Sequence, residues 1–227
     1  MSVSQRAARG VGWTLILLGI HILLYLTYLL WWTGMETGAV QAELLEEFAL
    51  DFGDPQAALP GEYQDITDAE VAAVAAGDAY AAMWFERDGQ RVVHDDVLYV
   101  VEGVDVDSLK RGPGHEPRSD KPGGAGNFVI SGHRTTYGQP FYNLDVLEPG
   151  DEIHVVDRDG KKWVYDYQES LIVQPTDVWV TRRGAFGDEP TLTLTTCNPR
   201  WSASQRLIAW ATLRVDEPTD QASEAAP

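Results

Sequence analysis

Three side chains of the types that perform acyl transfer stand where the sequence predicts strands to begin or end. Cys197 ends the run TLTLTTC, His133 follows the apolar run NFVISG, and Arg206 begins the run RLIAWATL. A thiol attacks a carbonyl carbon as its thiolate, so it needs a basic or cationic neighbour. A histidine can fill that role and then protonate a leaving amine, whereas an arginine stays protonated and donates hydrogen bonds to an oxyanion. Together the three suit acyl transfer through a thioester.

Each of the three residues also has an ordinary structural explanation. Free cysteine is among the residue types most often buried, and this chain has one cysteine in all. A histidine after a strand is usually a surface or structural residue, and an arginine nine positions after a cysteine is usually there by chance. Spacing alone therefore favours the structural explanations. The sequences of the surrounding motifs must decide between a structural and a catalytic role.

The composition excludes several classes of protein. The 35 acidic residues exceed the 17 lysines and arginines, which argues against binding to nucleic acid phosphates. A single cysteine excludes an internal disulfide and a site with several cysteine ligands. Although acids are abundant, no loop shows a spacing typical of calcium ligands. The sequence thus predicts no metal and no cofactor.

An uncharged apolar segment lies near the N-terminus. Residues 11–32 read VGWTLILLGIHILLYLTYLLWW, which is long enough for a helix to cross a bilayer core of about 30 Å. Arg6 and Arg9 precede it and acids follow it, so the positive-inside rule predicts a cytoplasmic N-terminus at residues 1–10 and an extracytoplasmic remainder. A cleaved signal peptide is the alternative, but its apolar region would be shorter and the cleavage motif is poor. We expect an uncleaved single-pass anchor in the cell membrane.

The remainder divides into three parts. Residues 33–77 read as an extracytoplasmic stalk, with helical spacing in AVQAELLEEFAL and an Ala-rich short helix before Gly77. Residues 78–216 hold seven or eight short runs of β-branched and aromatic residues, with Asp159-Gly160 as a hairpin turn. This pattern predicts a mainly β protein with a closed barrel or sandwich and disfavours a parallel α/β sheet. Residues 217–227 form an acidic tail without aromatics, predicted to be disordered.

Two motifs in this β region resemble those of sortases. The stretch TLTTC (residues 193–197), followed by Arg206, is similar to the sortase signature Thr-Leu-x-Thr-Cys with an arginine on the next strand. The stretch GNFVISGHRTTYGQPFYNLDVLEPGDEI (residues 126–153) resembles the segment around the sortase histidine, and VVEGVDVDSLKRGPGH (residues 100–115) resembles the segment before it. The resemblance covers residues 80–215 and is closest to class E, the actinobacterial housekeeping type.

The resemblance implies a fold and an activity. Sortases are membrane-anchored cysteine transpeptidases with an eight-stranded β-barrel, and they cleave a C-terminal LAxTG or LPxTG sorting signal of secreted proteins between Thr and Gly. An amine of a lipid-linked peptidoglycan precursor then resolves the thioester. Cys197 would be the nucleophile, His133 the acid and base, and Arg206 the oxyanion or substrate-orienting residue. A pilus-polymerising sortase and a non-catalytic, membrane-tethered, peptide-binding barrel are the alternatives. Asp54-Pro55-Gln56 lacks the lid motif of pilus-building enzymes, and a second membrane span is missing.

Five further residues are candidates for substrate binding. Thr195 and Thr196 precede the cysteine, and Asn198 and Tyr137 flank the two catalytic candidates. His115, in the loop GPGHEP, is expected to lie on the substrate side and is a second candidate base, although nothing obvious would hold it rigidly. His154 alternates along a predicted strand and is expected to be exposed.

Overall fold

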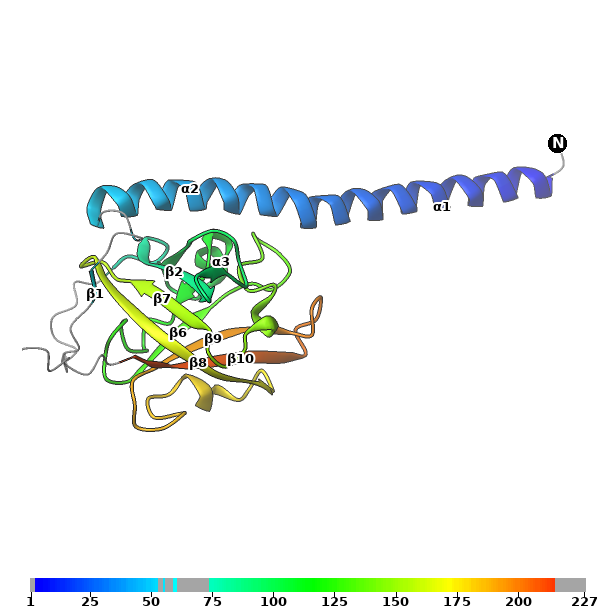
Figure 1. Ribbon diagram of the computed structural model, residues 1–227. Coiled ribbons are helices and arrows are strands. Elements are labelled where there is room, and N and C mark those ends of the chain that lie inside the picture. Colours follow the sequence, from blue (N-terminus) through cyan, green and yellow to red (C-terminus); the bar gives the residue numbers. More distant parts are fainter. Residues whose placement is uncertain (1–2, 53–54, 56–58, 61–73, 215–227) are drawn as a thin grey trace, which may run out of the picture.

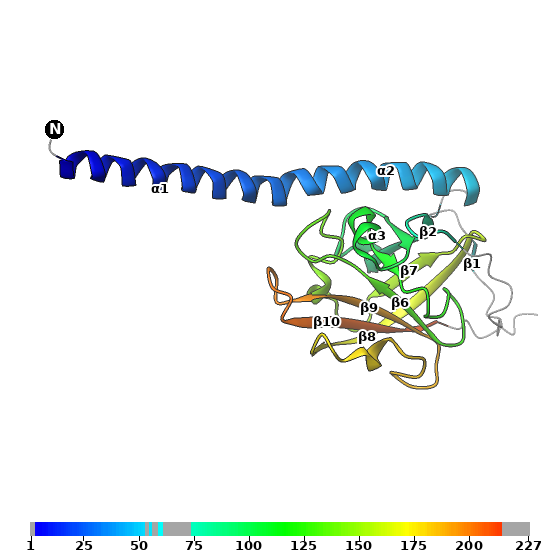
Figure 2. The same ribbon diagram turned by 180° about the vertical axis from the view of Figure 1, so that it is seen from behind.

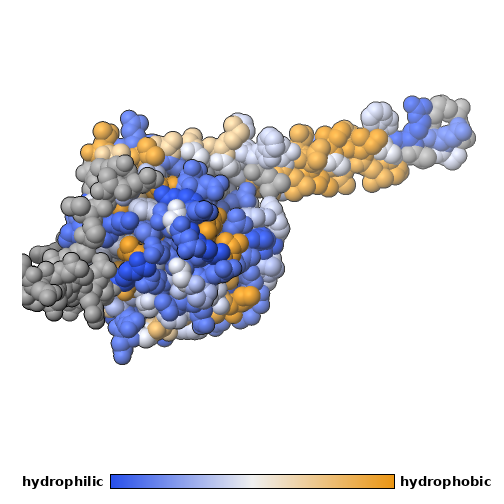
Figure 3. Space-filling model, in the orientation of Figure 1, coloured by the Kyte–Doolittle hydropathy of each residue, from blue (hydrophilic) through white to orange (hydrophobic). Residues whose placement is uncertain are grey.

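A long N-terminal helical run and a β-barrel make up the computed structural model, which describes residues 3–52, 55, 59–60 and 74–214. The run consists of α1 (Val3–Thr27), a π-helical turn (Tyr28–Trp32) and α2 (Thr33–Phe52). In both ribbon views α2 lies along the barrel and α1 extends beyond it (Figures 1 and 2). Hydrophobic side chains cover the middle of the projecting helix, between the barrel and a hydrophilic N-terminal end (Figure 3). By length and composition, residues Arg9–Thr27 could cross a membrane.

Eight strands close into the predicted barrel. Hydrogen bonding runs from β8 through β10, β9, β6, β5 and β4 to β2, and β7 pairs with both β2 and β8, which closes the ring. The strands of the ring are β2 (Ala79–Arg87), β4 (Leu98–Glu102), β5 (Gly114–His115), β6 (Asn127–Ser131), β7 (Glu152–Val156), β8 (Lys161–Val173), β9 (Thr191–Asn198) and β10 (Gln205–Leu213). Two short strands, β1 (Leu59–Pro60) and β3 (Gln90–Arg91), pair with β8 and β2 outside the ring.

Short helices connect some of these strands. They are α3 (Val106–Arg111), whose first turn is capped by the Asp105 carboxylate, and two 3₁₀ turns, Leu144–Val146 and Val178–Thr181. The hairpin predicted at Asp159-Gly160 joins β7 and β8, with Gly160 at a φ of 71° that favours glycine. Most of the Ala-rich helix predicted before Gly77 and the whole acidic tail lie outside the described residues, and residues 74–77, where that helix was expected to end, are not helical.

Alternation along β6 and β9 fills the barrel interior. Phe128 and Ile130 of β6 and Leu192 and Leu194 of β9 are fully buried in one cluster with side chains from the other strands. Because side chains alternate between the two faces of a strand, these positions fix which residues face inward. The β6–β9 pair is parallel and the β9–β10 pair antiparallel, so the barrel sheet is mixed.

The segment predicted to be a stalk packs against the barrel over its first half. Leu44 and Phe48 of α2 are fully buried in a second cluster, which contains Trp84 of β2 and Tyr99 of β4. The Gln41 side chain accepts a hydrogen bond from Tyr99 N at 2.8 Å and donates one to Tyr99 O at 2.9 Å. The helical spacing predicted here is confirmed, and the helix is fixed on the barrel wall along its length.

Candidate active site

The three catalytic candidates lie on neighbouring segments of the sheet. Cys197 lies on β9, between β6 and β10, and Arg206 of β10 is its direct cross-strand partner. On the other side, β6 runs parallel to β9 as far as the Ser131–Thr195 pair, and His133 follows two residues later. The loop stays attached beyond the strand, because Gly132 N donates to the carbonyl of Thr195 at 3.0 Å. Cys197 therefore lies between the strand of Arg206 and the loop of His133.

Strand alternation places this site on the outer face of the barrel. Leu192 and Leu194 point into the core, so Cys197, an odd number of positions further along β9, points outward. Side chains of directly opposed residues share one face of a sheet, so Arg206 points the same way as Cys197. Cys197 is half-buried and carries a free thiol. On this face of β9 Thr191 and Thr193 are buried, whereas Thr195 and Cys197 are partly exposed, so the sulfur atom is accessible only at the C-terminal end of the strand.

Burial controls the charge of His133. Its ring is half-buried, and desolvation lowers its pKa below the ordinary value of 6.5. The Nδ1 atom lies 3.4 Å from the hydroxyl of Thr136, and the ring of Tyr137 packs 4.9 Å from the imidazole ring. At neutral pH the ring is therefore predominantly neutral, the form that accepts a proton from a thiol.

Backbone carbonyls hold the Arg206 side chain. Its Nη1 atom donates to the carbonyls of Ala203 and Gln205, at 3.0 Å in each case. A guanidinium group has five N–H donors in a rigid plane, and those on Nε and Nη2 have no partner among the described residues, so they can bind an oxyanion or a substrate carbonyl. Arg206 is half-buried beside Cys197, where such a donor stabilises negative charge more strongly than in bulk water.

The structure adds a residue that the sequence did not indicate. Arg134 is buried, and its Nη1 atom donates to the carbonyl of Cys197 at 3.3 Å and to Oδ1 of Asn198 at 2.7 Å. Its Nη2 atom pairs with Asp145 at 3.0 Å. Arg134 thus ties the backbone of the nucleophile to the loop that carries His133. Its place next to His133 in the sequence was the only signal, and that does not reveal a partner on β9.

Both threonines predicted to bind substrate have partners within the protein. The hydroxyl of Thr196 is buried and donates to the carbonyl of Gly132 at 2.7 Å. The hydroxyl of Thr195 lies 2.9 Å from that of Ser131 on β6. These bonds hold β9 against β6 and its loop. By strand alternation Thr196 shares the inward face of β9 with Leu194, and its role in substrate binding stays a prediction.

The other two flanking candidates lie on either side of the catalytic residues. The Asn198 amide accepts from Arg134 and donates to Gln205 at 3.1 Å, so it anchors the turn after β9. Tyr137 packs on His133, and its backbone N–H donates to the hydroxyl of Thr33 on α2 at 3.5 Å. Tyr137 also lines a cavity of about 670 Å³ between α2 and the barrel. Tyr137 therefore lies between His133 and α2.

His115 occupies a different place from the one expected. It is 4% exposed and pairs with Ile130, whose side chain faces the core, so its ring lies on the inner face of the sheet, opposite to Cys197. Its Nδ1 atom is 2.7 Å from Oε2 of Glu102, and its ring stacks on Tyr80 with centroids 4.1 Å apart. The expectation that nothing holds His115 rigidly is wrong. A strand, a carboxylate and an aromatic ring fix it inside the barrel.

Comparisons with known proteins show the family of the chain. The family model described as the sortase domain matches residues 94–214. Sortase E1 of Streptomyces coelicolor is 30% identical over 225 residues, which are 93% of this chain, and the chain spans 58% of the length of that relative.

Solved structures give the same result. A Clostridium perfringens sortase D5 transpeptidase matches with a TM-score of 0.60 and 30% identity, over 78% of this chain and 99% of that one. Sortase E1 of S. coelicolor, solved with a tripeptide in its active site, matches with a TM-score of 0.53 and 28% identity, over 65% and 98% of the two chains. The matched family model covers more than half of the chain, including His133, Cys197 and Arg206. The chain therefore belongs to the sortase family, with class E sortases among its relatives.

Proposed function

We propose that the chain is a membrane-anchored cysteine transpeptidase that cleaves a C-terminal LAxTG or LPxTG sorting signal between Thr and Gly. The observation that carries the proposal is the arrangement of Cys197 on β9, with Arg206 directly opposite on β10 and the His133 loop attached on the other side. Such an arrangement suits acyl transfer, because neighbouring segments supply a nucleophile, a proton carrier and an oxyanion donor.

In the first half-reaction His133 takes the proton of the Cys197 thiol. The sulfur then attacks the carbonyl carbon of the threonine, and a C–S bond forms while the carbonyl oxygen gains the negative charge. Arg206 donates hydrogen bonds to that oxygen. When the C–N bond to glycine breaks, the leaving amine takes the proton held by His133, and a thioester remains on Cys197.

In the second half-reaction an amine of a peptidoglycan precursor attacks the thioester. His133 takes a proton from the incoming amine, the new amide bond forms, and the C–S bond breaks to release the thiolate of Cys197. The same proton then returns to the sulfur. The secreted protein is thereby joined to the acceptor, and the enzyme returns to its starting state with atoms and charges balanced.

The apolar segment bears on the side of the membrane at which the reaction would occur. Arg6 and Arg9 precede the apolar segment, which supports a cytoplasmic N-terminus and an extracytoplasmic barrel. Secreted proteins that carry the sorting signal, and the lipid-linked acceptor, would then meet the site at the outer surface of the membrane.

The experiment uses the full-length chain in detergent, with LAxTG and LPxTG peptides and mass spectrometry of the products. We expect cleavage between Thr and Gly, complete loss in Cys197→Ala, and a loss of about 10²-fold or more in His133→Ala and Arg206→Ala. Arg118→Ala, which removes an exposed arginine, is the matched control and should keep full activity. Cleavage by Cys197→Ala would overturn the mechanism, and binding of the peptide without cleavage would favour the non-catalytic barrel.

The acceptor is tested in the same assay. We expect an amine of the wall-peptide type, added in excess, to appear in the product and to increase turnover. If a pilin lysine is joined instead and the wall-type amine is not, the pilus-polymerising alternative replaces the proposal, although the roles of Cys197, His133 and Arg206 stay as described.

A further inference from the structure

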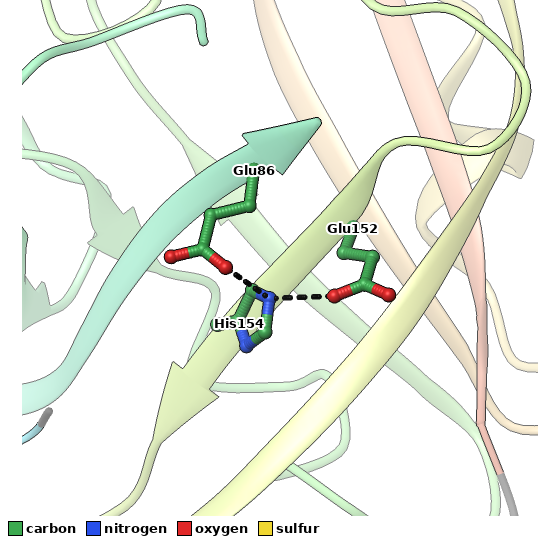
Figure 4. A group of neighbouring side chains, drawn as sticks. All are labelled: Glu86, Glu152 and His154. Carbon is green, nitrogen blue, oxygen red and sulfur yellow. Dashed lines mark hydrogen bonds and ion pairs between the residues drawn. The ribbon is translucent and has the colours of Figure 1, made fainter. Parts of the chain in front are cut away.

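A second cluster of chemically active side chains lies on another part of the barrel wall. Glu86 of β2 pairs directly with Glu152 of β7, and Trp84 of β2 pairs with His154 of β7. These residues share one face of the two strands, and Figure 4 shows both carboxylates directed at the imidazole ring. The strands β2 and β7 are separated from β9 by β8 and β10 in one direction around the ring, so this cluster is no part of the site at Cys197.

The spacing of the three side chains matches that of ligands around a small cation. The Nε2 atom of His154 lies 2.9 Å from Oε2 of Glu152 and 3.3 Å from Oε2 of Glu86. Around a tetrahedral Zn²⁺ with bonds of about 2.0–2.1 Å, two ligand atoms are about 3.3 Å apart. One atom from each of the three residues lies within 4.8 Å of the others. A cation can therefore be bound with small side-chain shifts.

Neighbouring groups hold the carboxylates so that one oxygen of each stays directed at His154. The Oε1 atom of Glu86 accepts from Trp84 Nε1 at 2.9 Å and pairs with Arg91 at 3.3 Å. The Oε1 atom of Glu152 pairs with Arg214 at 2.8 Å. Outer contacts of this kind orient ligands in metal sites. In both glutamates the Oε2 atom remains for the shared position.

The His154 ring is held in place, but its hydrogen bonding is incomplete. His154 is 5% exposed, contrary to the exposure expected from the sequence, and its ring stacks on Trp84 with centroids 5.1 Å apart. Its Nδ1 atom has no hydrogen-bond partner among the described residues. A neutral imidazole carries one N–H, which cannot fully satisfy two carboxylates, whereas a cation at the shared position attracts both.

We propose that Glu86, Glu152 and His154 bind a divalent transition cation of the Zn²⁺ class, with the remaining coordination position open to water. An imidazole ligand favours Zn²⁺ and its neighbours over Ca²⁺ or Mg²⁺, which take oxygen ligands. Both glutamates are partly exposed, so an ion can enter from solvent. The cation would join β2 to β7, the strand whose pairing closes the barrel, and its effect would be on stability.

The sequence offered no sign of this site, because the glutamates come from strands far apart in the chain. Only Glu152 and His154 are near neighbours in the sequence, and two ligands two residues apart on a strand are common without a metal. The charge of Lys162, which acts on His154, opposes the cation, so its removal should strengthen binding. The proposal therefore predicts that some variants weaken Zn²⁺ binding and that others tighten it.

The experiment measures Zn²⁺ binding by calorimetry on the full-length chain in detergent, in a Cys197→Ala background that removes the thiol as a competing ligand. We expect one bound Zn²⁺ per chain and a rise in the thermal unfolding temperature when ZnCl2 is added. His154→Gln and Glu152→Gln should each weaken binding by about tenfold or more, the range seen when supporting groups of a metal site are lost. Lys162→Met should tighten it.

Matched controls are His94→Gln and Glu169→Gln, which change a histidine and a glutamate outside the cluster and should leave Zn²⁺ binding unchanged. Unfolding curves without metal show that each variant is folded. The absence of stoichiometric binding in the parent would overturn the proposal, as would binding of unchanged affinity in both folded His154→Gln and Glu152→Gln.

Discussion

Burial of His133 favours the neutral form of its imidazole ring in the folded protein. Desolvation lowers its pKa below 6.5, so the unfolded chain takes up a proton at a higher pH than the folded chain does. The contribution of His133 to stability is therefore complete above about pH 6.5 and is lost as the pH falls through the pKa of the folded state.

His133→Gln should make stability less sensitive to acid in this window. We expect the free energy of unfolding to fall less steeply between about pH 7 and pH 5 in the variant than in the parent, because the group that protonates first in the unfolded chain is gone. Denaturant unfolding at a series of pH values measures the difference. Parallel pH profiles of parent and variant would contradict the desolvation of His133.

Arg134 is a positioning residue, because it contacts the backbone of the nucleophile and makes no contact with its sulfur. Arg134→Gln removes the charge that joins Asp145 to the carbonyl of Cys197 and to Asn198. We expect kcat to fall about tenfold or more with a smaller change in KM, since small displacements of a nucleophile slow the chemical step. Alkylation rates of Cys197 should change in parallel.

Arg200→Gln is the matched control for this variant. Arg200 pairs with the same Asp145 at 2.7 Å but donates to the carbonyl of Tyr142, so it does not contact the strand of Cys197. We expect it to keep most of its activity. Equal losses of activity in both variants would show that the effect comes from Asp145 and its loop. They would contradict a positioning role for Arg134.

At the scale of elements, α2 is part of the folded domain. Leu44 and Phe48 complete a core cluster with β2 and β4, and Gln41 satisfies both backbone groups of Tyr99. The same helix also reaches α3 and the loop of His133, because Thr37 donates to the carbonyl of Lys110 and Thr33 accepts from Tyr137 N. The helix that follows the apolar segment thus supports the wall next to the site.

Phe48→Ala should destabilise the protein by about 3–5 kcal/mol, the usual range for removing a buried phenylalanine. The matched control is Leu50→Ala on the same helix, where the side chain is 79% exposed and the change should stay within about 0.5 kcal/mol. Unfolding of both variants in detergent, followed by tryptophan fluorescence, gives the comparison. A stability of Phe48→Ala equal to that of Leu50→Ala would show that α2 leaves the barrel in solution.

At the scale of the whole molecule, labelling of the single cysteine can show on which side of the membrane the barrel lies. Cys197 lies half-buried on the outer face of the barrel, and the orientation proposed from Arg6 and Arg9 would put the barrel outside the cell. A membrane-impermeant maleimide should therefore label the chain in intact cells, without lysis, at Cys197 alone.

Cys197→Ala is the control for this labelling, because it removes the only thiol of the chain. Addition of a peptide that carries the sorting signal should slow the labelling of the parent, since the peptide covers the sulfur. Labelling that requires lysis of the cells would place the barrel in the cytoplasm and would contradict the orientation proposed for Arg6 and Arg9.

Local patterns were enough to predict much of this protein. Alternating Leu and Thr before Cys197 predicted a strand with its leucines inside, and Leu192 and Leu194 are buried as expected. The uncharged run before Thr33 predicted a membrane helix, and the helical spacing after it predicted the helix that the structure contains. These features depend on neighbours within a few residues, so the sequence contains them in full.

Pairings between distant strands could not be obtained in this way. The sequence suggested that His115 was a free loop residue and His154 an exposed one, yet both are buried, because the strands that cover them come from other parts of the chain. The contacts of Arg134 with β9, and of His154 with Glu86, arise from the same long-range pairing. The sequence by itself determined the residue types, the strands and the apolar helix. Only the closed barrel decided which side chains face one another, since the face and partner of each strand depend on the register of the whole sheet.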